Sequence, residues 1–161
     1  MGAWSYQTFK EMREGTHTFS GMAAWRIIRV TTRTLEDKAS VPLLATAVSG
    51  RYFDVLNIKP VIGRLLTDDD VDRIAPVAVL SHQYWTERFG ADRNVIGRTL
   101  LLNGQAVSVI GVTPPEFSGI YTGVVPQLYV PLTLQPALAG VNLLDDQIGR
   151  ASCRERVCQY V

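Results

Sequence analysis

The sequence has few of the residues that usually carry chemistry. Only two histidines, His17 and His82, and two cysteines, Cys153 and Cys158, occur in 161 residues. Both cysteines lie near the C-terminal end, so the rest of the chain has no thiol. One cysteine pair cannot complete a structural zinc site. A disulfide between them requires the end of the chain to bend back on itself.

An excess of charge of one sign is also missing. The net charge is +1, whereas a nucleic-acid-binding domain usually has a strongly basic face. We therefore expect no nucleic-acid partner. The small surplus comes from residues 148–161, which carry three arginines and one glutamate.

Long uninterrupted hydrophobic runs are absent as well. The most apolar stretch, residues 119–144, contains Pro126, Pro131 and Pro136, which would break a transmembrane helix. The N-terminus lacks the basic start and apolar core of a signal peptide. With 47% hydrophobic and 19% charged residues, the composition is that of one globular domain.

The clearest structural signal is a strand followed by a helix in the middle of the chain. The short apolar run Val77–Leu80 predicts a buried strand, and Ser81 after it is a helix N-cap. Trp85 and Phe89 then lie four residues apart, on one face of the helix. Gly90 supplies the left-handed residue that commonly ends a helix.

A β-hairpin follows. Asn103 and Gly104 lie between two apolar runs, and this pair favours the type I′ turn, which needs positive φ at both central residues. A two-residue turn fixes the register, with Leu100 opposite Val107. We expect the more apolar face to pack against the preceding helix; that face carries Leu100, Leu102, Val107 and Val109.

Shorter patterns predict the remaining elements. Residues 28–34 alternate between apolar or threonine positions and Arg29, Thr31 and Arg33, which is typical of a half-exposed strand. Together the patterns indicate an α+β fold, with short helices on mostly antiparallel strands. We expect helices at 5–14 and 49–56, further strands at 41–48 and 128–132, and a tight connection at 18–25.

An acidic run is the main candidate for a metal site. Asp68, Asp69, Asp70 and Asp72 follow Thr67, and hard cations prefer carboxylate oxygens. The run lacks the ligand spacing of a calcium loop. Carboxylates in the first turn of a helix capped by Thr67 are also favoured by the helix dipole, and we prefer this structural reading. A metal-dependent hydrolase that uses Asp68–Asp72 and His82 is a less favoured hypothesis.

Other candidate residues also have a structural explanation. Arg29 and Arg33 can bind an anion or an acidic partner, but such a row is more often a solvated face. No serine lies in a nucleophile elbow, and no glycine-rich loop suits a phosphate. We therefore assign no catalytic, cofactor-binding or metal-binding residues. The aromatic residues favour core packing over a ligand pocket; they are Tyr52, Phe53, Tyr84, Trp85 and Phe89.

Nine segments in order point to a known family. They are residues 5–13, 18–24, 48–56, 60–67, 76–81, 84–90, 95–104, 109–117 and 128–132. The set resembles the periplasmic core domain of MacB-type ABC transporter permeases, especially the large permeases with duplicated halves found in acidobacteria. The resemblance covers nearly all of residues 5–146.

This resemblance implies a function without catalysis. It implies an extracytoplasmic domain between two transmembrane helices of a permease in the bacterial inner membrane, on the periplasmic side. The domain would couple membrane-helix motion to export or to work on the cell envelope. The implied partners are an ABC ATPase subunit or domain and a second permease copy or half. Because the membrane helices are missing, we read the chain as a fragment of an export protein.

The resemblance also defines the domain and its key residues. We expect the domain at 1–147 and a non-native tail at 148–161, because residues 148–157 resemble a translated sequencing adapter. The expected packing anchors are Tyr52, Phe53, Trp85, Phe89 and the hairpin leucines. The alternative function is a free-standing periplasmic small-molecule binding module, with its pocket between the helix at 81–89 and the sheet.

Overall fold

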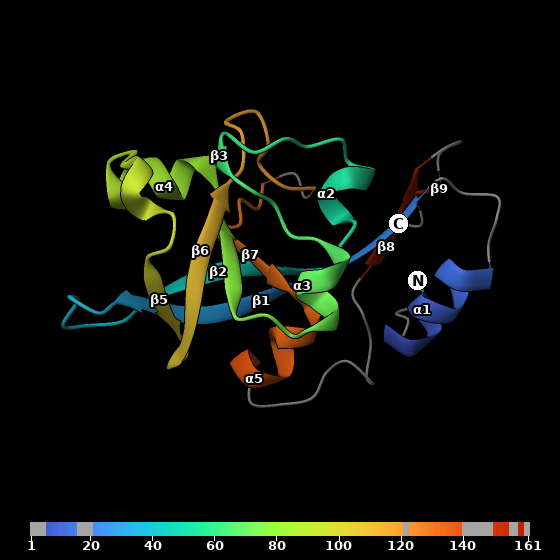
Figure 1. Ribbon diagram of the computed structural model, residues 1–161, viewed down its shortest axis with the longest axis horizontal. Coiled ribbons are helices and arrows are strands. Elements are labelled where there is room, and N and C mark those ends of the chain that lie inside the picture. The colour runs from blue at the N-terminus through green and yellow to red at the C-terminus, as the bar shows by residue number, and fades with distance from the viewer. Residues whose placement is uncertain (1–5, 16–20, 121–122, 140–149, 155–157, 160–161) are drawn as a thin grey trace.

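The computed structural model describes residues 6–15, 21–120, 123–139, 150–154 and 158–159 (Figure 1). The strands are β1 (Gly21–Thr34), β2 (Val41–Val48), β3 (Ile62–Gly63), β4 (Val77–Leu80), β5 (Thr99–Leu102), β6 (Gln105–Val112), β7 (Leu128–Pro131), β8 (Arg150–Arg154) and β9 (Cys158–Gln159). The α-helices are α1 (Tyr6–Gly15), α2 (Tyr52–Val55), α3 (Asp68–Asp72), α4 (His82–Phe89) and α5 (Gln135–Ala139). Two 3₁₀ turns, η1 (Arg93–Val95) and η2 (Leu132–Leu134), complete the described elements.

Six of the strands form a closed ring. The strand order runs β2, β7, β4, β6, β5, β1, and β1 pairs again with β2. Figure 1 shows β4 and β6 crossing the long β1–β2 pair. The pairs β2–β7 and β4–β6 are parallel, and the other described pairs are antiparallel, so the expected α+β fold with mostly antiparallel strands is confirmed. Closure leaves the paired parts of these strands without a free edge.

The main hydrophobic core lies inside this ring and is closed by helices. Alternate residues of each strand point inward, as the period of two requires. Trp85 from α4 and Leu138 from α5 add to the same core, and Phe89 packs on it. Its strand residues include Ile28, Val30, Leu43, Ala45, Ala78, Leu80, Leu100, Leu102, Val107, Val109, Leu128 and Val130.

The helix and hairpin in the middle of the chain form as predicted. The Ser81 hydroxyl oxygen accepts a hydrogen bond from the Tyr84 N–H, and Gly90 ends α4 in the left-handed conformation. In the hairpin, φ is positive at both Asn103 (49°) and Gly104 (84°). Leu100 lies opposite Val107, which confirms the predicted register.

The predicted connection at 18–25 is wrong from Gly21 onward. Residues Gly21–Trp25 are the first part of β1, and all five are buried. Ala23 and Ala24 are fully buried, and a Cβ on Gly21 would lie 2.9 Å from Val55 Cγ2. Small side chains allow close packing on both faces, and a strand buried on both faces shows no alternation.

The predicted helix at 49–56 is also shorter than expected, since α2 covers only Tyr52–Val55. Ser49 lies before α2 and is bonded to β1 instead, since its Oγ accepts a hydrogen bond from the Ala24 N–H at 3.0 Å. In the tail, β8 pairs with Gly21–Trp25, and β9 folds back so that Cys158 lies opposite Cys153. Ser5, His17 and the expected boundary at Gln147 lie outside the described residues.

Strands β3 and β6 approach each other at two glycines. Gly63 pairs with Gly111, and the Arg64 N–H donates to Ile110 O at 2.9 Å. A Cβ on Gly111 would lie 2.0 Å from the Arg64 carbonyl oxygen. Only glycine at this position lets the segment that carries Arg64 lie against the sheet.

We therefore expect Gly111→Ala to destabilise the protein by about 2–3 kcal/mol, because the added methyl group displaces Arg64 from β6. Urea unfolding followed by circular dichroism measures this loss. Gly15→Ala is the control, since a Cβ there meets nothing within 4 Å, and it should change stability by no more than about 1 kcal/mol. Equal stability of the two variants would contradict the close approach.

Candidate functional site

The short helix α3 connects several distant parts of the chain, and Asp70 is its central residue. The Asp70 side chain accepts two hydrogen bonds from the Arg64 guanidinium, at 2.6 and 2.8 Å. It also accepts a hydrogen bond from the backbone N–H of Thr67 at 2.9 Å. Asp70 is only 5% exposed, so these bonds replace the water that a carboxylate would otherwise bind.

These contacts determine the pKa of Asp70. Burial alone would raise the pKa, because it disfavours the charged form. The hydrogen bonds from Arg64 and Thr67 outweigh burial, so the pKa lies below the usual 3.8. Asp70 is therefore a charged structural residue that joins α3 to the segment after β3.

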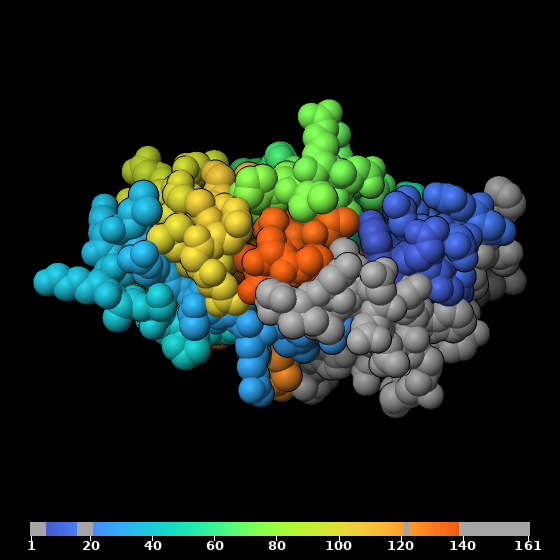
Figure 2. Space-filling view, turned by 90° about the horizontal axis from the view of Figure 1, so that it is seen from below, coloured from blue at the N-terminus to red at the C-terminus, as the bar shows by residue number. Residues whose placement is uncertain are grey.

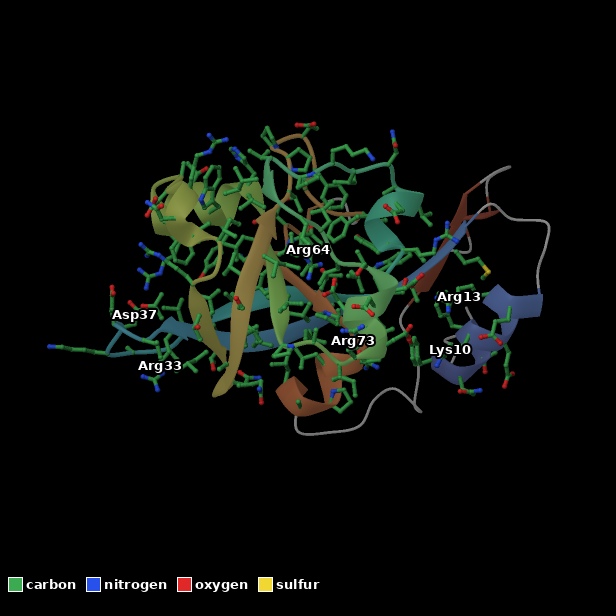
Figure 3. All side chains as sticks on the ribbon, viewed as in Figure 1. Lys10, Arg13, Arg33, Asp37, Arg64 and Arg73 are labelled. Carbon is green, nitrogen blue, oxygen red and sulfur yellow. The ribbon has the colours of Figure 1, made fainter. Side chains whose placement is uncertain are left out.

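The other described carboxylates of α3 pair with arginines or lie in solvent. Asp68 lies 3.3 Å from Arg13 on α1, and Asp69 lies 2.9 Å from Arg73 (Figure 3). Within the described ranges, no three His, Cys, Asp or Glu residues come together in a group that could hold a metal ion. Three carboxylates of the acidic run thus pair with arginines, and Asp72 is exposed. The metal-hydrolase hypothesis has no support in this part of the chain.

His82 does not join the acidic run in a group that could hold a metal ion, within the described part of the chain. His82 is the first residue of α4 and is half-buried, with its ring 5.5 Å from the Trp85 ring in an edge-to-face contact. His17 lies outside the described residues.

Helix α1 is attached to the rest of the molecule by a small contact. Phe9 is its one buried residue, and it enters the main core. Tyr6 packs beside it, and burial, followed by the nearby charge of Asp72, raises the pKa of Tyr6. The Arg13–Asp68 pair, with both side chains partly exposed, completes the contact with α3. The helix thus has a polar outer face and a narrow anchored side.

Most of the expected packing anchors are buried, in two separate cores, whereas Phe89 is half-buried against the main core. Trp85 joins Leu100 and Leu102 in the main core, whereas the half-buried Leu101 faces the other side of the hairpin. The Trp85 Nε1–H donates to the Asp92 carbonyl oxygen at 2.9 Å. Tyr52 and Phe53 belong to the second core, whose rings lie 5.1–6.4 Å apart. That aromatic cluster is formed by Trp25, Tyr52, Phe53, Phe117 and Tyr129.

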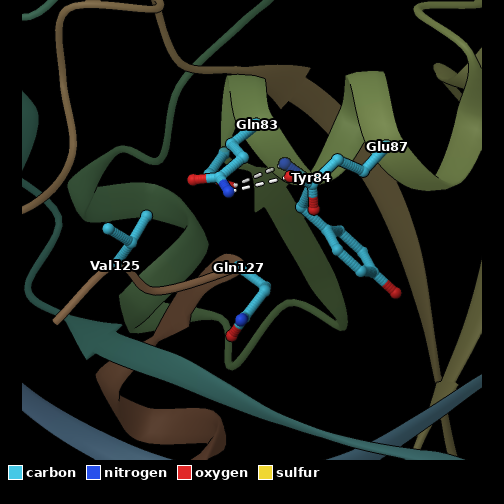
Figure 4. A pocket seen from close by; sticks show the side chains of 6 residues that line it. Gln83, Tyr84, Glu87, Val125 and Gln127 are labelled. Carbon is cyan, nitrogen blue, oxygen red and sulfur yellow. Dashed lines mark hydrogen bonds between the residues drawn. The ribbon is translucent and has the colours of Figure 1, made fainter.

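A small pocket lies beside α4, where the alternative function requires a ligand site (Figure 4). Its volume is about 110 Å³, well below the several hundred Å³ of usual small-molecule sites. Gln83 donates to Glu87 at 2.8 Å across its rim. This volume does not favour the binding-module alternative. The lining residues are Ser81, Gln83, Tyr84, Glu87, Val125 and Gln127.

Asn103 has a second role that the turn signal does not reveal. Its Oδ1 accepts the Thr31 N–H at 2.7 Å, and its own N–H donates to Thr31 O at 2.9 Å. Its Nδ2 donates to the Leu138 carbonyl oxygen at 2.6 Å, near the end of α5. One turn residue therefore joins β1, the hairpin and α5.

These features describe a domain in which polar residues connect elements. A sequence model of the MacB-like periplasmic core domain matches residues 3–151. The chain belongs to this family. The resemblance found in the sequence is thereby confirmed, and the domain is an extracytoplasmic part of ABC-type transporter permeases.

Curated relatives of this MacB-like domain are export proteins. The chain is 38% identical over 84 residues to the macrolide export ATP-binding/permease protein MacB of Aggregatibacter actinomycetemcomitans. It is 36% identical over 84 residues to the probable syringafactin export ATP-binding/permease protein SyfD of Pseudomonas syringae pv. tomato. Each alignment covers 52% of this chain and 13% of the relative, so the chain corresponds to a small part of these proteins.

Solved structures share the fold. The periplasmic region of MacB from Actinobacillus actinomycetemcomitans matches with a TM-score of 0.74 and 21% identity, over 99% of this chain and 68% of that one. The extracellular domain of the noncanonic ABC-type transporter YknZ from Gram-positive bacteria matches with a TM-score of 0.73 and 19% identity, over 96% and 74%. Within the described residues of the present chain, no helix has the length and apolarity needed to cross a bilayer.

We predict that Asp70→Asn lowers the free energy of unfolding by about 2 kcal/mol, because the charge-assisted bonds to Arg64 are weakened in a buried position. Urea unfolding at neutral pH provides the measurement. Asp69→Asn is the matched control, since the Asp69–Arg73 pair is largely exposed and should contribute less than about 1 kcal/mol. If both variants lose the same stability, Asp70 has no special structural role.

Two carboxyls give stability a defined pH dependence. Hydrogen bonds from Arg88 and Thr34 lower the pKa of Asp37 from 3.8 to about 2, and the pKa of Asp70 is lowered as well. Below pH 4 the unfolded chain therefore binds more protons than the folded one. We expect the stability from these groups to be complete above pH 4 and to fall as the pH decreases toward 2. In thermal melts over this pH range, the melting temperature of Asp37→Asn/Asp70→Asn should decrease less with falling pH than that of the unmodified chain. An equal dependence of melting temperature on pH in the two proteins would contradict the assignment.

Proposed function

We propose that this domain is a non-catalytic mechanical element of an ABC-type export permease in the bacterial inner membrane. The family match over residues 3–151 carries the proposal. The ATP-binding/permease names of the relatives support a role beside an ABC ATPase, and a second permease copy or half is the further partner that we propose. Within the described residues the polar contacts join elements to one another, which suits a part that transmits force.

We infer that α1 is the element through which membrane motion reaches the domain. Its contacts with the rest of the fold include the buried Phe9, the half-buried Tyr6 beside it and the Arg13–Asp68 pair. Asp68 belongs to the helix in which Asp70 binds Arg64, so a displacement of α1 acts on α3 and on the segment beside β6. If α1 changes between two positions on the domain, the two positions must have similar free energies, which a small contact surface permits.

We also propose residues 1–147 as the domain and 148–161 as a tail outside it. The adapter-like sequence of residues 148–157 supports this boundary. The pairing of β8 with Gly21–Trp25 is compatible with it, since strand pairing uses backbone groups that any non-proline segment can offer.

The charge pair at α1 gives a direct test in the full-length permease with its ATPase. Arg13→Asp places two carboxylates together, and we expect it to weaken the docking of α1 on α3. Spin labels on Arg93→Cys in two permease copies would report the motion of the domain, as a distance change between nucleotide-free and ATP-bound states. Arg13→Asp should reduce that change by at least about half.

The reversed pair Arg13→Asp/Asp68→Arg should restore the distance change, and Gln7→Ala on the exposed side of α1 should leave it intact. ATP hydrolysis should persist in every variant, because we place it on another protein or domain. A full distance change in Arg13→Asp would exclude this route. ATP hydrolysis by the purified 161-residue chain would contradict the non-catalytic function.

A further inference from the structure

The end of the β1–β2 hairpin projects from the molecule. We call residues 29–41 the arm: the last part of β1, the turn and the first residue of β2. Figures 1 and 2 show it at one end of the long axis, with α1 at the opposite end. Leu35 lies in its turn and is 71% exposed, the highest value among the large apolar side chains of the described residues. A single exposed leucine is common on protein surfaces, so Leu35 alone does not indicate a binding site. The other residues of the arm have to be considered with it.

Three cations of the arm have no carboxylate partner in the described part of the chain. Arg29, Arg33 and Lys38 are exposed and form no ion pair there. Of the two carboxylates in the arm, Asp37 already accepts hydrogen bonds from Arg88 and from the Thr34 N–H, and the exposed Glu36 forms no ion pair among the described residues. Outside the arm, Lys59 and Arg93 are likewise exposed and form no ion pair among the described residues. The arginines that do form ion pairs are Arg13, Arg64, Arg73, Arg88 and Arg98.

The arm is held in place before any partner arrives. Arg88 from α4 forms an ion pair with Asp37, which is labelled at the end of the arm in Figure 3. Thr32–Thr34 pair with β5, and Thr31 is bound by Asn103. Arg29 and Arg33 lie on one exposed face of a strand, so their Cα atoms are about 13 Å apart. A fixed surface loses little conformational entropy on binding.

The start of β2 makes strand addition an unfavourable mode of binding. β7 pairs only with residues 45–48 of β2, so this edge has no strand partner earlier in β2 among the described residues. Pro42 lies there and has no N–H to offer an added strand. A partner would therefore bind through the side chains of the arm.

We propose that the arm is a docking surface for a protein segment rich in carboxylates and carrying apolar side chains. The arginines would bind carboxylates in the bidentate geometry that guanidinium favours, and Leu35 would enter an apolar pocket of the partner. The fixed spacing of the arginines suits carboxylates on one extended segment. Two exposed apolar side chains, Leu35 and Val41, and three cations are a small set for holding a lipid surface. This proposal is independent of the α1 coupling, because it concerns the opposite end of the molecule.

Two fluorescently labelled polymers test the proposal on the 161-residue chain by anisotropy at low salt. One is poly-L-glutamate, and the other is a glutamate–tyrosine copolymer that adds apolar side chains. We expect both to bind and the copolymer to bind more tightly. Arg29→Glu/Arg33→Glu should weaken both by at least about tenfold, and Arg29→Gln/Arg33→Gln should do so by a smaller factor. Leu35→Ser should weaken only the copolymer.

Lys59→Glu/Arg93→Glu is the matched control, since it makes the same change in net charge at exposed cations outside the arm. It should weaken binding by less than about threefold. An equal loss in the two Glu double variants would show a non-specific charge effect and would overturn the proposal. Stronger binding to phosphatidylglycerol vesicles than to either polymer would assign the arm to lipid instead. Thermal melts of each variant confirm that the fold is intact.

Discussion

The pairing of β1 along both of its edges holds the molecule together. One edge pairs with β2 over residues 25–32, and the other pairs with β5 over 32–34. Strand β8 of the tail also pairs with residues 21–25, but it is not part of the ring. Because β5 belongs to the hairpin and β2 reaches β7, β1 closes the ring around the main core. The two ends of β1 then have different surroundings: its start is buried on both faces, and its end carries the exposed arm.

Local signals were sufficient for the elements whose conformation is decided locally. The Asn103–Gly104 turn fixes a register, and Ser81 and Gly90 bound α4 through cap geometry, so these features could be predicted. The start of β1 could not. Its alternation disappears because α2 covers the second face, where Ala23 and Trp25 join the aromatic core. Ring closure is likewise a long-range result that no local pattern encodes.

The contacts of α3 were also predictable only in part, because their partners come from segments that approach through long-range packing. The Thr67 cap and the acidic first turn are visible in the sequence, and the structure contains both. What the carboxylates bind depends on the approach of β3 to β6 at Gly63 and Gly111, which brings Arg64 to Asp70. The family assignment came from the order of several weak motifs, and the function proposed for the domain depends on that assignment.

The three-way contact of Asn103 has a kinetic consequence. Its partners are 72 residues away at Thr31 and 35 residues away at Leu138. Such distant segments meet only after a large loss of chain entropy, which slows the search for the native arrangement. The hairpin can form early and alone, whereas its link to the first strand and to the last helix of the core has to wait until most of the chain has collapsed. The contacts of the Asn103 turn with β1 and α5 therefore depend on segments that lie far apart in the sequence.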